Sequence, residues 1–424
     1  MPLWGTLFII FAICLILRVP IAMALGTSAL ICLWSLGVPL VTVGQKMFTS
    51  IDQFSLMAIP FFILAGNLMC EGGISRRLCD FCNALLWKVR GGVAMASVLA
   101  CAFFGALSGS GPATVISIGS MMYPDMVERG YPKRDAAGLL AASGGLGPLI
   151  PPSIVMVVYG CQTNTSIGNM FIAGAGIGLL LAAFLMGMVQ VEAHRKNWPA
   201  NEGKMTVKML WNSFTKAILA LGMPIIVLGG IYGGIFTPTE AACVSVVYSF
   251  IVGKFIFRNL SWKMMPEILK KSAIGAAVVL FIVSTSTVFA WLFSYAGFTQ
   301  EIVGIFLSAN LTPTGFLVGL AIVLLIFGCF MDATPIIILI MPIVLPIAQQ
   351  LGVESIHLAM VVCLGCVIGM MTPPVALNIF AAGTVSHLSV EEITKGELKY
   401  FFMAVIELFL VVFIPKLSTF LLGY

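Results

Sequence analysis

The chain has few charged residues. Asp, Glu, Lys and Arg make up 9% of its 424 residues, whereas about a quarter is usual for a soluble domain. Hydrophobic residues make up 60%, and the mean hydropathy is +1.08. Its longest polar stretches, roughly 194–216 and 254–271, are too short to form a soluble domain. This composition excludes a soluble protein and predicts one that spans a membrane.

Motifs for nucleotide hydrolysis and transition-metal binding are also missing. The sequence has no GxxxxGK[ST] motif, so ATP does not drive this chain directly. Its three histidines lie away from the glycine-proline segments described below. Cys79/Cys82 and Cys363/Cys366 have CxxC spacing, but no further pair or histidine completes a metal set. We therefore interpret the cysteines as packing residues and predict no cofactor.

Apolar runs of about 20 residues recur along the whole chain, which is the length that a membrane-spanning helix needs. Alternation with a period of two residues, typical of barrel strands, is missing. The sequence thus predicts an all-α polytopic membrane protein. We expect spanning helices at about 3–17, 20–38, 54–70, 136–160, 170–192, 217–235, 239–253, 272–295, 355–380 and 400–424.

One pattern of helix breakers occurs twice, about 222 residues apart. Phe104-Gly105 precedes the segment Ser108-Gly109-Ser110-Gly111-Pro112, and Phe327-Gly328 precedes Met331-Asp332-Ala333-Thr334-Pro335. Pro124/Pro346, Gly147/Gly369, Pro151/Pro373 and Pro152/Pro374 follow with one common offset. Paired, Gly/Pro-interrupted apolar segments in two halves of a chain indicate the binding site of a secondary transporter.

The basic residues predict the topology. If 91–124 and 312–346 are re-entrant, all Lys and Arg residues except Lys46 and Lys416 fall on one face, which the positive-inside rule makes cytoplasmic. The N-terminus is then periplasmic or extracellular. The net charge of +5 follows from this asymmetry, so we expect no nucleic-acid partner.

Length supports the re-entrant interpretation. Without its tip, each arm has about 14 residues and measures roughly 21 Å, less than the roughly 30 Å of a hydrocarbon core. Two helical hairpins are therefore expected to meet near the bilayer centre from opposite sides. Each half then has an odd number of crossings, which predicts two inverted-topology repeats, 1–200 and 217–424, joined by a cytoplasmic linker at 201–216.

The tips and the helices that face them offer ligands for a cation and an acid. A broken helix leaves carbonyl groups that suit Na⁺ and N–H groups that suit a carboxylate. The segments 136–160 and 355–380 are expected to break at Gly144-Gly145-x-Gly147-Pro148 and between Gly365 and Pro374. Side-chain oxygens come from Ser108, Ser110, Ser143, Ser153, Thr334, Thr372 and Asn378. The alternative is that these kinks serve only helix packing.

Asp332 is the only acid expected at a tip, deep in the membrane. Intramembrane carboxylates are costly and usually functional. The side chain could bind a cation, accept a proton or hold substrate hydroxyls, and the alternative is a cap for the second arm of the hairpin. We interpret Glu240 as a helix cap and Glu407 as a structural or partner-facing residue.

These motifs resemble those of a known family, the DctM-like large membrane (M) subunits of tripartite ATP-independent periplasmic (TRAP) transporters, in the ion-transporter superfamily. The resemblance runs through Phe104–Ser110, Ala142–Ser153, Gly234–Ala241 and Ile368–Pro374. It implies a sodium-coupled elevator in the bacterial inner membrane that takes an organic acid from a periplasmic binding protein (P). A small membrane (Q) subunit of about four helices is implied as a separate partner.

The resemblance also implies roles for individual positions. Substrate binding falls to Ser110, Ser153 and Asp332, to which we add Asn378. Sodium binding falls to Ser108, Gly144, Gly147, Gly328, Gly365, Gly369 and Thr372, to which we add Ser143 and Thr334. The acid itself stays open between a C4-dicarboxylate, sialic acid or another sugar acid, and a keto acid.

Two functions of other classes remain as alternatives. A passive channel would not need a gated site with two tips. An intramembrane serine hydrolase could use Ser108 or Ser110 as its nucleophile, but it needs a base, and the histidines fall in loops or at helix ends. We therefore expect a transporter rather than an enzyme.

Overall fold

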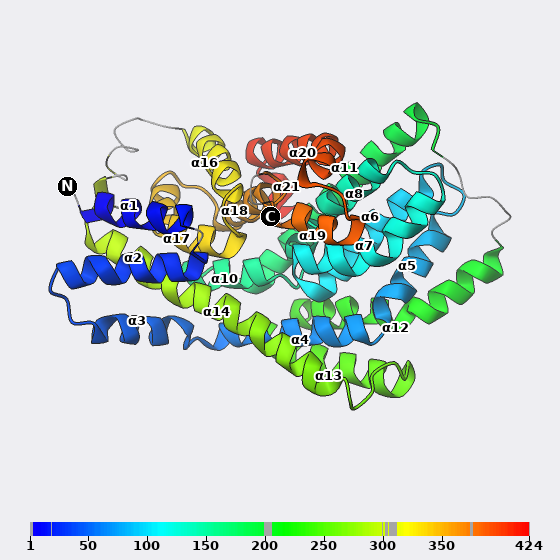
Figure 1. The fold of residues 1–424 in the computed structure, drawn as a ribbon, viewed down its shortest axis with the longest axis horizontal. Coiled ribbons are helices and arrows are strands. Elements are labelled where there is room, and N and C mark those ends of the chain that lie inside the picture. Colours follow the sequence, from blue (N-terminus) through cyan, green and yellow to red (C-terminus); the bar gives the residue numbers. More distant parts are fainter. Residues whose placement is uncertain are drawn as a thin grey trace.

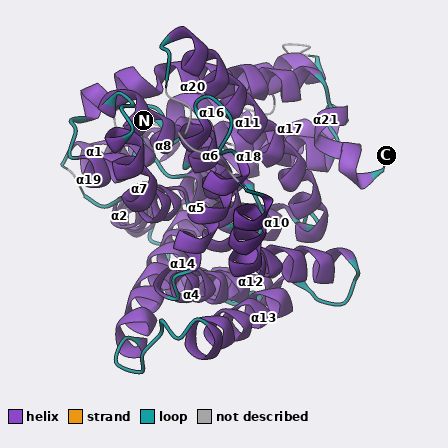
Figure 2. Cartoon of the chain, turned by 90° about the vertical axis from the view of Figure 1, so that its right-hand side faces the viewer, coloured by secondary structure: helices purple, strands orange, loops and turns teal. Residues whose placement is uncertain are grey.

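The computed structural model describes residues 3–423 except 18, 199–205, 299, 302–303, 305–311 and 374–375. These residues form helices joined by short connections, with no strand among them (Figures 1 and 2). The prediction of an all-α fold is therefore confirmed. Arg18, Lys204 and Pro374, which the sequence predictions used, lie outside the described residues.

The first half contains eleven α-helices and one short 3₁₀ helix among the described residues. They are α1 (Leu3–Ile16), α2 (Ile21–Ser35), α3 (Val41–Ile51), η1 (Phe54–Met57), α4 (Ala58–Glu71), α5 (Ile74–Leu85), α6 (Gly92–Ser108), α7 (Gly111–Glu128), α8 (Lys133–Ser143), α9 (Leu146–Leu149), α10 (Ile154–Thr163) and α11 (Ile167–Arg195).

The described part of the second half repeats much of this order. It contains α12 (Val207–Tyr232), α13 (Pro238–Ile251), η2 (Val252–Ile256), α14 (Met265–Tyr295), α16 (Pro313–Gly328), α17 (Ala333–Gln350), α18 (Ser355–Gly369), α19 (Leu377–Ser386), α20 (Val390–Phe413), α21 (Lys416–Thr419) and η3 (Phe420–Leu422). In each half a helical hairpin (α6–α7 or α16–α17) precedes a broken helix (α8–α10 or α18–α19) and then a long helix (α11 or α20).

Both hairpin tips fall where the sequence predicts them. The helix α6 ends at Ser108, and the φ of 60° at the next residue, Gly109, places it in the left-handed region that favours glycine. Ser110 is then extended, and α7 begins with Gly111-Pro112, since proline is tolerated in the first helical turn. In the second hairpin, α16 ends at Gly328, and Asp332 precedes α17.

The hairpin arms are longer than expected. They contain 17, 18, 16 and 18 residues rather than about 14, because α7 continues to Glu128 and α17 to Gln350. An arm of 18 residues measures about 27 Å, so arm length alone separates a re-entrant arm from a spanning helix only weakly. The arm α17 is indeed long and apolar enough to be a candidate span.

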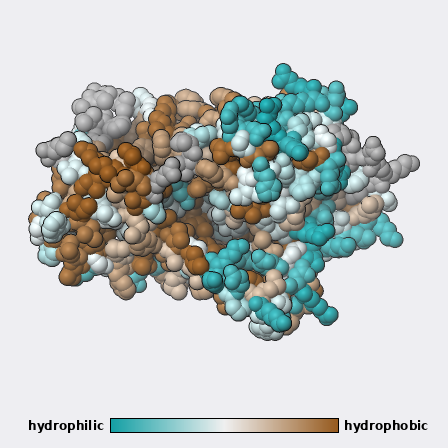
Figure 3. All heavy atoms as spheres, viewed as in Figure 1, coloured by the Kyte–Doolittle hydropathy of each residue, from teal (hydrophilic) through white to brown (hydrophobic). Residues whose placement is uncertain are grey.

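Six described helices are long and apolar enough to cross a membrane, or eight if each of two bent pairs counts as one span. Fewer helices reach this length than the sequence predicts, because α1, α2 and α18 have only 14 or 15 residues. Hydrophilic residues gather toward the right-hand end in Figure 3, where Figure 1 draws the start of α12 and the end of α13.

Two short helices, α3 and α5, were not expected. Each alternates apolar and polar residues and therefore lacks the long apolar run from which the spans were predicted. The helix α5 buries Leu78 and Phe81 and exposes Arg76. The helix α12 begins at Val207, within the predicted linker, because its first turns also pack: the rings of Phe214 and Phe81 lie 5.8 Å apart.

Candidate functional site

The tip of the first hairpin is held by a small hydroxyl network. The Thr114 hydroxyl donates to the Ser110 carbonyl (2.8 Å), and the Ser108 and Thr114 hydroxyls lie 2.8 Å apart. The Ser110 hydroxyl makes no hydrogen bond to a described residue, although the side chain is partly buried. Thr114 is fully buried and was missed in the sequence, although it lies only four residues after Ser110.

The broken helix α8–α10 closes tightly around this tip. A methyl group on Gly147 would lie 2.6 Å from the Ser110 carbonyl oxygen and 2.8 Å from the Thr114 hydroxyl. A methyl group on Gly105 would lie 2.8 Å from the Cα of Gly147. Only glycine lets the two backbones approach this closely. The predicted residues Ser108, Ser110 and Gly147 therefore lie together.

Ser143 and Ser153 are near this tip but have local partners. Ser143, which is fully buried, donates to the Leu139 carbonyl within α8 (2.7 Å). Ser153 is also fully buried and caps α10: its hydroxyl accepts from the Met156 N–H (3.3 Å) and donates to the Pro148 carbonyl. Both hydroxyls thus hold the broken helix in shape, and each keeps a lone pair for another donor or cation.

Asn378 joins the second half of the chain to the first tip. It belongs to α19, and its side chain lies against Gly111 and Gly144, where a methyl group on Gly111 would be 2.5 Å from the Asn378 Oδ1. Asn378 is fully buried, and neither atom of its amide has a hydrogen-bond partner among the described residues. A buried unpaired amide is unusual, which makes Asn378 a candidate for binding an ion or a ligand.

Around the second tip, the packing of α16 against α18 is equally close. A methyl group on Gly369 would lie 2.5 Å from the Cα of Gly328. Thr372 follows the end of α18, where its hydroxyl donates to the Ile368 carbonyl (3.3 Å). Thr334 is buried in the first turn of α17.

The position of the second break differs from the expectation. It was expected to begin at Gly365, but α18 runs through this residue and ends at Gly369. A methyl group on Gly365 would instead lie 2.9 Å from the Leu324 side chain of α16. Gly365 therefore serves close helix packing, and the irregular backbone begins at Met370.

Asp332 caps α17, as the alternative interpretation of this residue predicts. Its Oδ1 accepts from the Ala333 N–H at 2.7 Å, and the side chain is partly buried. Its other oxygen remains available, so the cap does not exclude a role in binding. Glu240 is a cap too: it forms a reciprocal capping box with Thr237 at the start of α13.

The two broken helices meet directly. The side chains of Met371 and Val367, at the end of α18, lie against Gly145 between α8 and α9. The helix α10 also packs on α17 of the second hairpin. The predicted residues thus form two clusters, one at each tip, and the clusters are joined through Gly145 and Asn378.

Two buried acids on α20 were not identified as unusual in the sequence. Glu397 and Glu407 are 1% and 0% exposed, and their carboxylate oxygens have no hydrogen-bond partner among the described residues. Glu407 faces the protein interior, which favours the structural interpretation of this residue over the partner-facing one. Glu397 gave no signal because it lies in a polar stretch near the predicted cytoplasmic face.

An ion-pair cluster ties α8, α11 and α20 together at one end. Lys196 and Lys399 each pair with both Asp135 and Glu192, over distances of 2.6 to 3.2 Å. Burial acts to lower the pKa of Lys196, but hydrogen bonds to the two carboxylates outweigh it and raise the pKa. Asp135, the Glu192/Lys196 pair and Lys399 are far apart in the sequence, which therefore did not predict the cluster.

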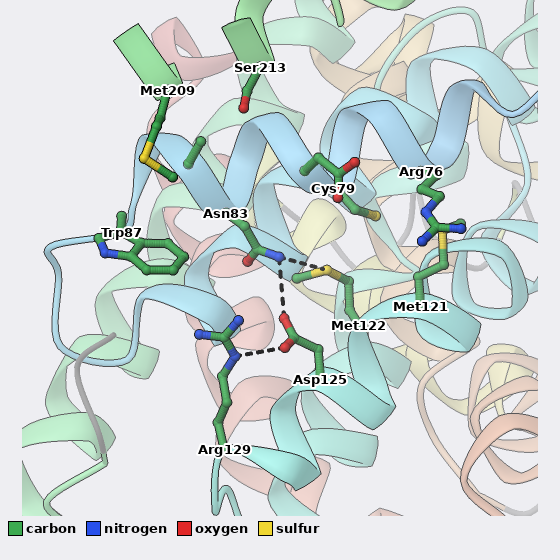
Figure 4. A pocket seen from close by; sticks show the side chains of 12 residues that line it. Arg76, Cys79, Asn83, Trp87, Met121, Met122, Asp125, Arg129, Met209 and Ser213 are labelled. Carbon is green, nitrogen blue, oxygen red and sulfur yellow. Dashed lines mark hydrogen bonds and ion pairs between the residues drawn. The ribbon is translucent and has the colours of Figure 1, made fainter. Parts of the chain in front are cut away.

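A polar cavity of about 470 Å³ lies at the far end of the first hairpin, between α5, α7 and α12 (Figure 4). Within it, the Arg129 Nε donates to Asp125 (2.7 Å), and the Asn83 amide donates to the other oxygen of that carboxylate (3.4 Å). None of the predicted site residues lines this cavity. In the described part of the chain, no three His, Cys, Asp or Glu side chains are grouped so that they could hold a metal ion.

The fold and these paired tips define a polytopic α-helical membrane protein of the secondary-transporter type. The model of the family described as "Tripartite ATP-independent periplasmic transporter, DctM component" matches residues 8–417. The chain therefore belongs to the DctM family, and the resemblance found in the sequence is confirmed.

Individual relatives agree with this assignment. The chain is 38% identical to the C4-dicarboxylate TRAP transporter large permease protein DctM of Rhodobacter capsulatus, over 94% of each chain. It is 38% identical to the isethionate TRAP transporter permease protein DctMQ of Oleidesulfovibrio alaskensis, over 98% of this chain and 66% of that protein. The solved structure of the Alcanivorax borkumensis YdaH transporter has the same fold, with a TM-score of 0.58, 14% identity and 88% of each chain covered.

Proposed function

We propose that this chain is the membrane permease subunit of a sodium-coupled, binding-protein-dependent transporter that imports an organic acid by an elevator mechanism. The family supports a transporter subunit rather than an enzyme, because the relatives are named as permeases. The elevator mechanism is what the resemblance to this family implies, and the coupling ion and the site are proposed from that resemblance together with the geometry of the tips.

The observation that carries the proposal is the unpaired, fully buried amide of Asn378 against the first tip. An amide offers both an acceptor for a cation and donors for a carboxylate. Beside it, the Ser110 carbonyl, the Ser108 hydroxyl and the backbone at Gly144 and Gly147 supply the oxygen ligands that a hard cation prefers.

In this proposal, sodium binds at both tips and the acid binds between them. The second cation shell comes from the backbone around Gly328 and Gly369 with Thr334 and Thr372, and Ser143 supports the first. The free hydroxyl of Ser110, together with Ser153, Asp332 and Asn378, faces the acid. The tips carry no arginine, so helix N-termini and hydroxyls must recognise the carboxylate.

The proposed substrate is an organic acid, such as a C4-dicarboxylate, sialic acid or another sugar acid. The names of the relatives support an anion, since one carries C4-dicarboxylates and another isethionate. We further propose a bacterial inner-membrane location with a periplasmic N-terminus, following the distribution of Lys and Arg.

The proposed partners are a periplasmic binding protein and a small membrane (Q) subunit of about four helices. The DctMQ relative supports the second partner, because this chain covers 66% of that protein and its name joins M and Q. Only 28% of the residues in the apolar window of α12, and 50% of those in α11, are buried within this chain. The remaining apolar surface of these helices is available to lipid and to a membrane partner.

Reconstitution tests the proposal. The chain is inserted into liposomes with its Q subunit, and the loaded binding protein is added outside. An inward Na⁺ gradient is expected to drive acid uptake, and the chain without its partners is expected to transport poorly. Equal uptake with a proton gradient and no Na⁺ contradicts sodium coupling.

The same liposomes separate a transporter from a passive channel. A sodium-coupled transporter accumulates the acid above its outside concentration, whereas a channel only equalises the two concentrations. Accumulation that stops when Na⁺ is equal on both sides supports the proposal. Equilibration without accumulation, whatever the Na⁺ gradient, favours the channel.

A further inference from the structure

An apolar cavity lies on the other side of the second hairpin from the candidate site. It has a volume of about 520 Å³ and is enclosed by α1, α14 and both arms of the hairpin, α16 and α17. Its lining consists of apolar side chains and glycine, and it is rich in phenylalanine: Phe8, Phe11, Phe289, Phe293, Phe316 and Phe327 are members.

The aromatic wall is well packed on the α1 and α14 side. The ring of Phe8 lies 5.1 Å from that of Phe293 and 6.0 Å from that of Phe289, both with edge-to-face geometry. Phe11 packs on Phe289 at 5.5 Å. Such pairs are favourable, so this wall is held by its own contacts and the cavity is not simply a loose region that would collapse.

The cavity opens toward the outside of the helix bundle. Three of its lining residues, Phe8, Val323 and Phe327, are 36%, 40% and 38% exposed, whereas Phe316 on the inner wall is 3% exposed. In a membrane protein the medium at such an opening is lipid hydrocarbon, which holds no water. A hydrated acid would lose its hydrogen bonds in this lining, so the transported substrate is excluded.

We propose that this cavity is a binding site for one acyl chain of a membrane lipid. An empty cavity of this size forfeits the dispersion contacts of its lining, and water cannot recover them because the walls offer few polar partners. A flexible hydrocarbon chain that enters between Phe8 and Phe327 recovers those contacts. The bound lipid therefore differs from the surrounding lipid in that one of its acyl chains is inserted between α14 and the second hairpin.

The glycine Gly319 provides a direct test. It lines the cavity on α16, and a methyl group placed on it would meet no atom within 4 Å. Gly319→Leu therefore fills the cavity without disturbing a packed neighbour, and Gly319→Ala fills it less. Gly187 on α11 is a matched control, because it is also an exposed helical glycine with open space around it, but it lies outside the cavity.

The experiment uses the whole chain in nanodiscs that contain a phosphatidylethanolamine with a diazirine in the middle of one acyl chain. After illumination, labelled peptides are identified by mass spectrometry. Labelling is expected on the cavity wall, at Phe293 and Phe316, in wild type and Gly187→Leu. It is expected to be lost in Gly319→Leu and reduced in Gly319→Ala, while labelling of the exposed Ile322 and Ile326 stays unchanged.

A second probe with the diazirine in the headgroup is expected to leave the cavity wall unlabelled. Labelling of the wall that is equal in wild type and Gly319→Leu overturns the proposal, as does wild-type labelling restricted to Ile322 and Ile326. If Gly319→Leu does not fold, the wild-type pattern and Gly319→Ala decide the question. The readout needs no transport, so its result is independent of the proposed function.

Discussion

The substitution Gly147→Ala probes the contact between the first tip and its broken helix. The added methyl group would lie 2.6 Å from the Ser110 carbonyl oxygen, whereas an ordinary contact begins at 3.4 Å. The tip must therefore move by about 0.8 Å, the difference between these two distances. Gly147 has no positive φ, so alanine fits its backbone conformation and the effect is steric.

This displacement acts on a group that we assign to the cation site. A misplacement of about 1 Å in a functional site can cost about a hundredfold in activity. We therefore expect sodium-driven uptake to fall by about ten- to a hundredfold, with a higher Na⁺ concentration for half-maximal uptake. Overpacking is expected to lower the free energy of unfolding by about 1–3 kcal/mol, which leaves the protein inserted.

The control is Gly229→Ala in α12, where a methyl group meets no atom within 4 Å. Alanine is a better helix former than glycine by up to about 1 kcal/mol, so this variant is expected to be neutral or slightly more stable. Both variants are compared at equal membrane abundance, by uptake in liposomes and by thermal unfolding. Wild-type uptake with unchanged Na⁺ dependence in Gly147→Ala refutes a cation site at this tip.

Further substitutions separate binding from structure. Ser110→Ala and Asp332→Ala are each expected to reduce uptake about ten- to a hundredfold, since losing a hydrogen bond to a charged group costs about 1.5–3 kcal/mol; near-normal uptake in Asp332→Ala would leave it only a cap. Glu407→Gln is expected to have a melting temperature no lower than that of wild type, because glutamine keeps the side-chain volume and removes a buried carboxylate. A large drop in melting temperature would contradict this. Lys399→Met is expected to lower the free energy of unfolding by about 3 kcal/mol, measured by thermal unfolding. Lys196→Met is expected to lower it by less, because the side chain of Lys196 is 39% exposed and that of Lys399 is 18% exposed. Equal losses in the two variants would contradict this difference.

The positions of the hairpins could be predicted because local chemistry determines them. Gly109 allows the left-handed backbone that ends α6, and Ser110 and Asp332 precede helices that start at Gly111 and Ala333. Each of these signals acts within a few residues of its own position. The recurrence of the pattern after about 222 residues made the signals recognisable as a pair.

The contacts between the tips could not be predicted in the same way. The sequence indicated that Asn378 lies near a broken helix, but not that it faces Gly111 and Gly144 of the other half. Likewise, glycine is a poor helix former, but Gly365 remains helical because it packs tightly against Leu324. Such outcomes depend on which helix becomes the neighbour, and hydropathy along one segment holds no information about this.

Contacts between the two halves, and within the second half, bear on how the site could move. Asn378 of α19 lies against the first tip, Met371 lies against Gly145, and the backbones of Gly328 and Gly369 touch. Glycine contacts between backbones leave no space for sliding, so we infer that both tips and both broken helices move as one body. On its opposite side, the second hairpin packs on α14 through α17, and an apolar cavity lies between α14 and the two arms of the hairpin. An apolar boundary on this side is what a body that slides within the membrane requires, which supports the elevator proposal.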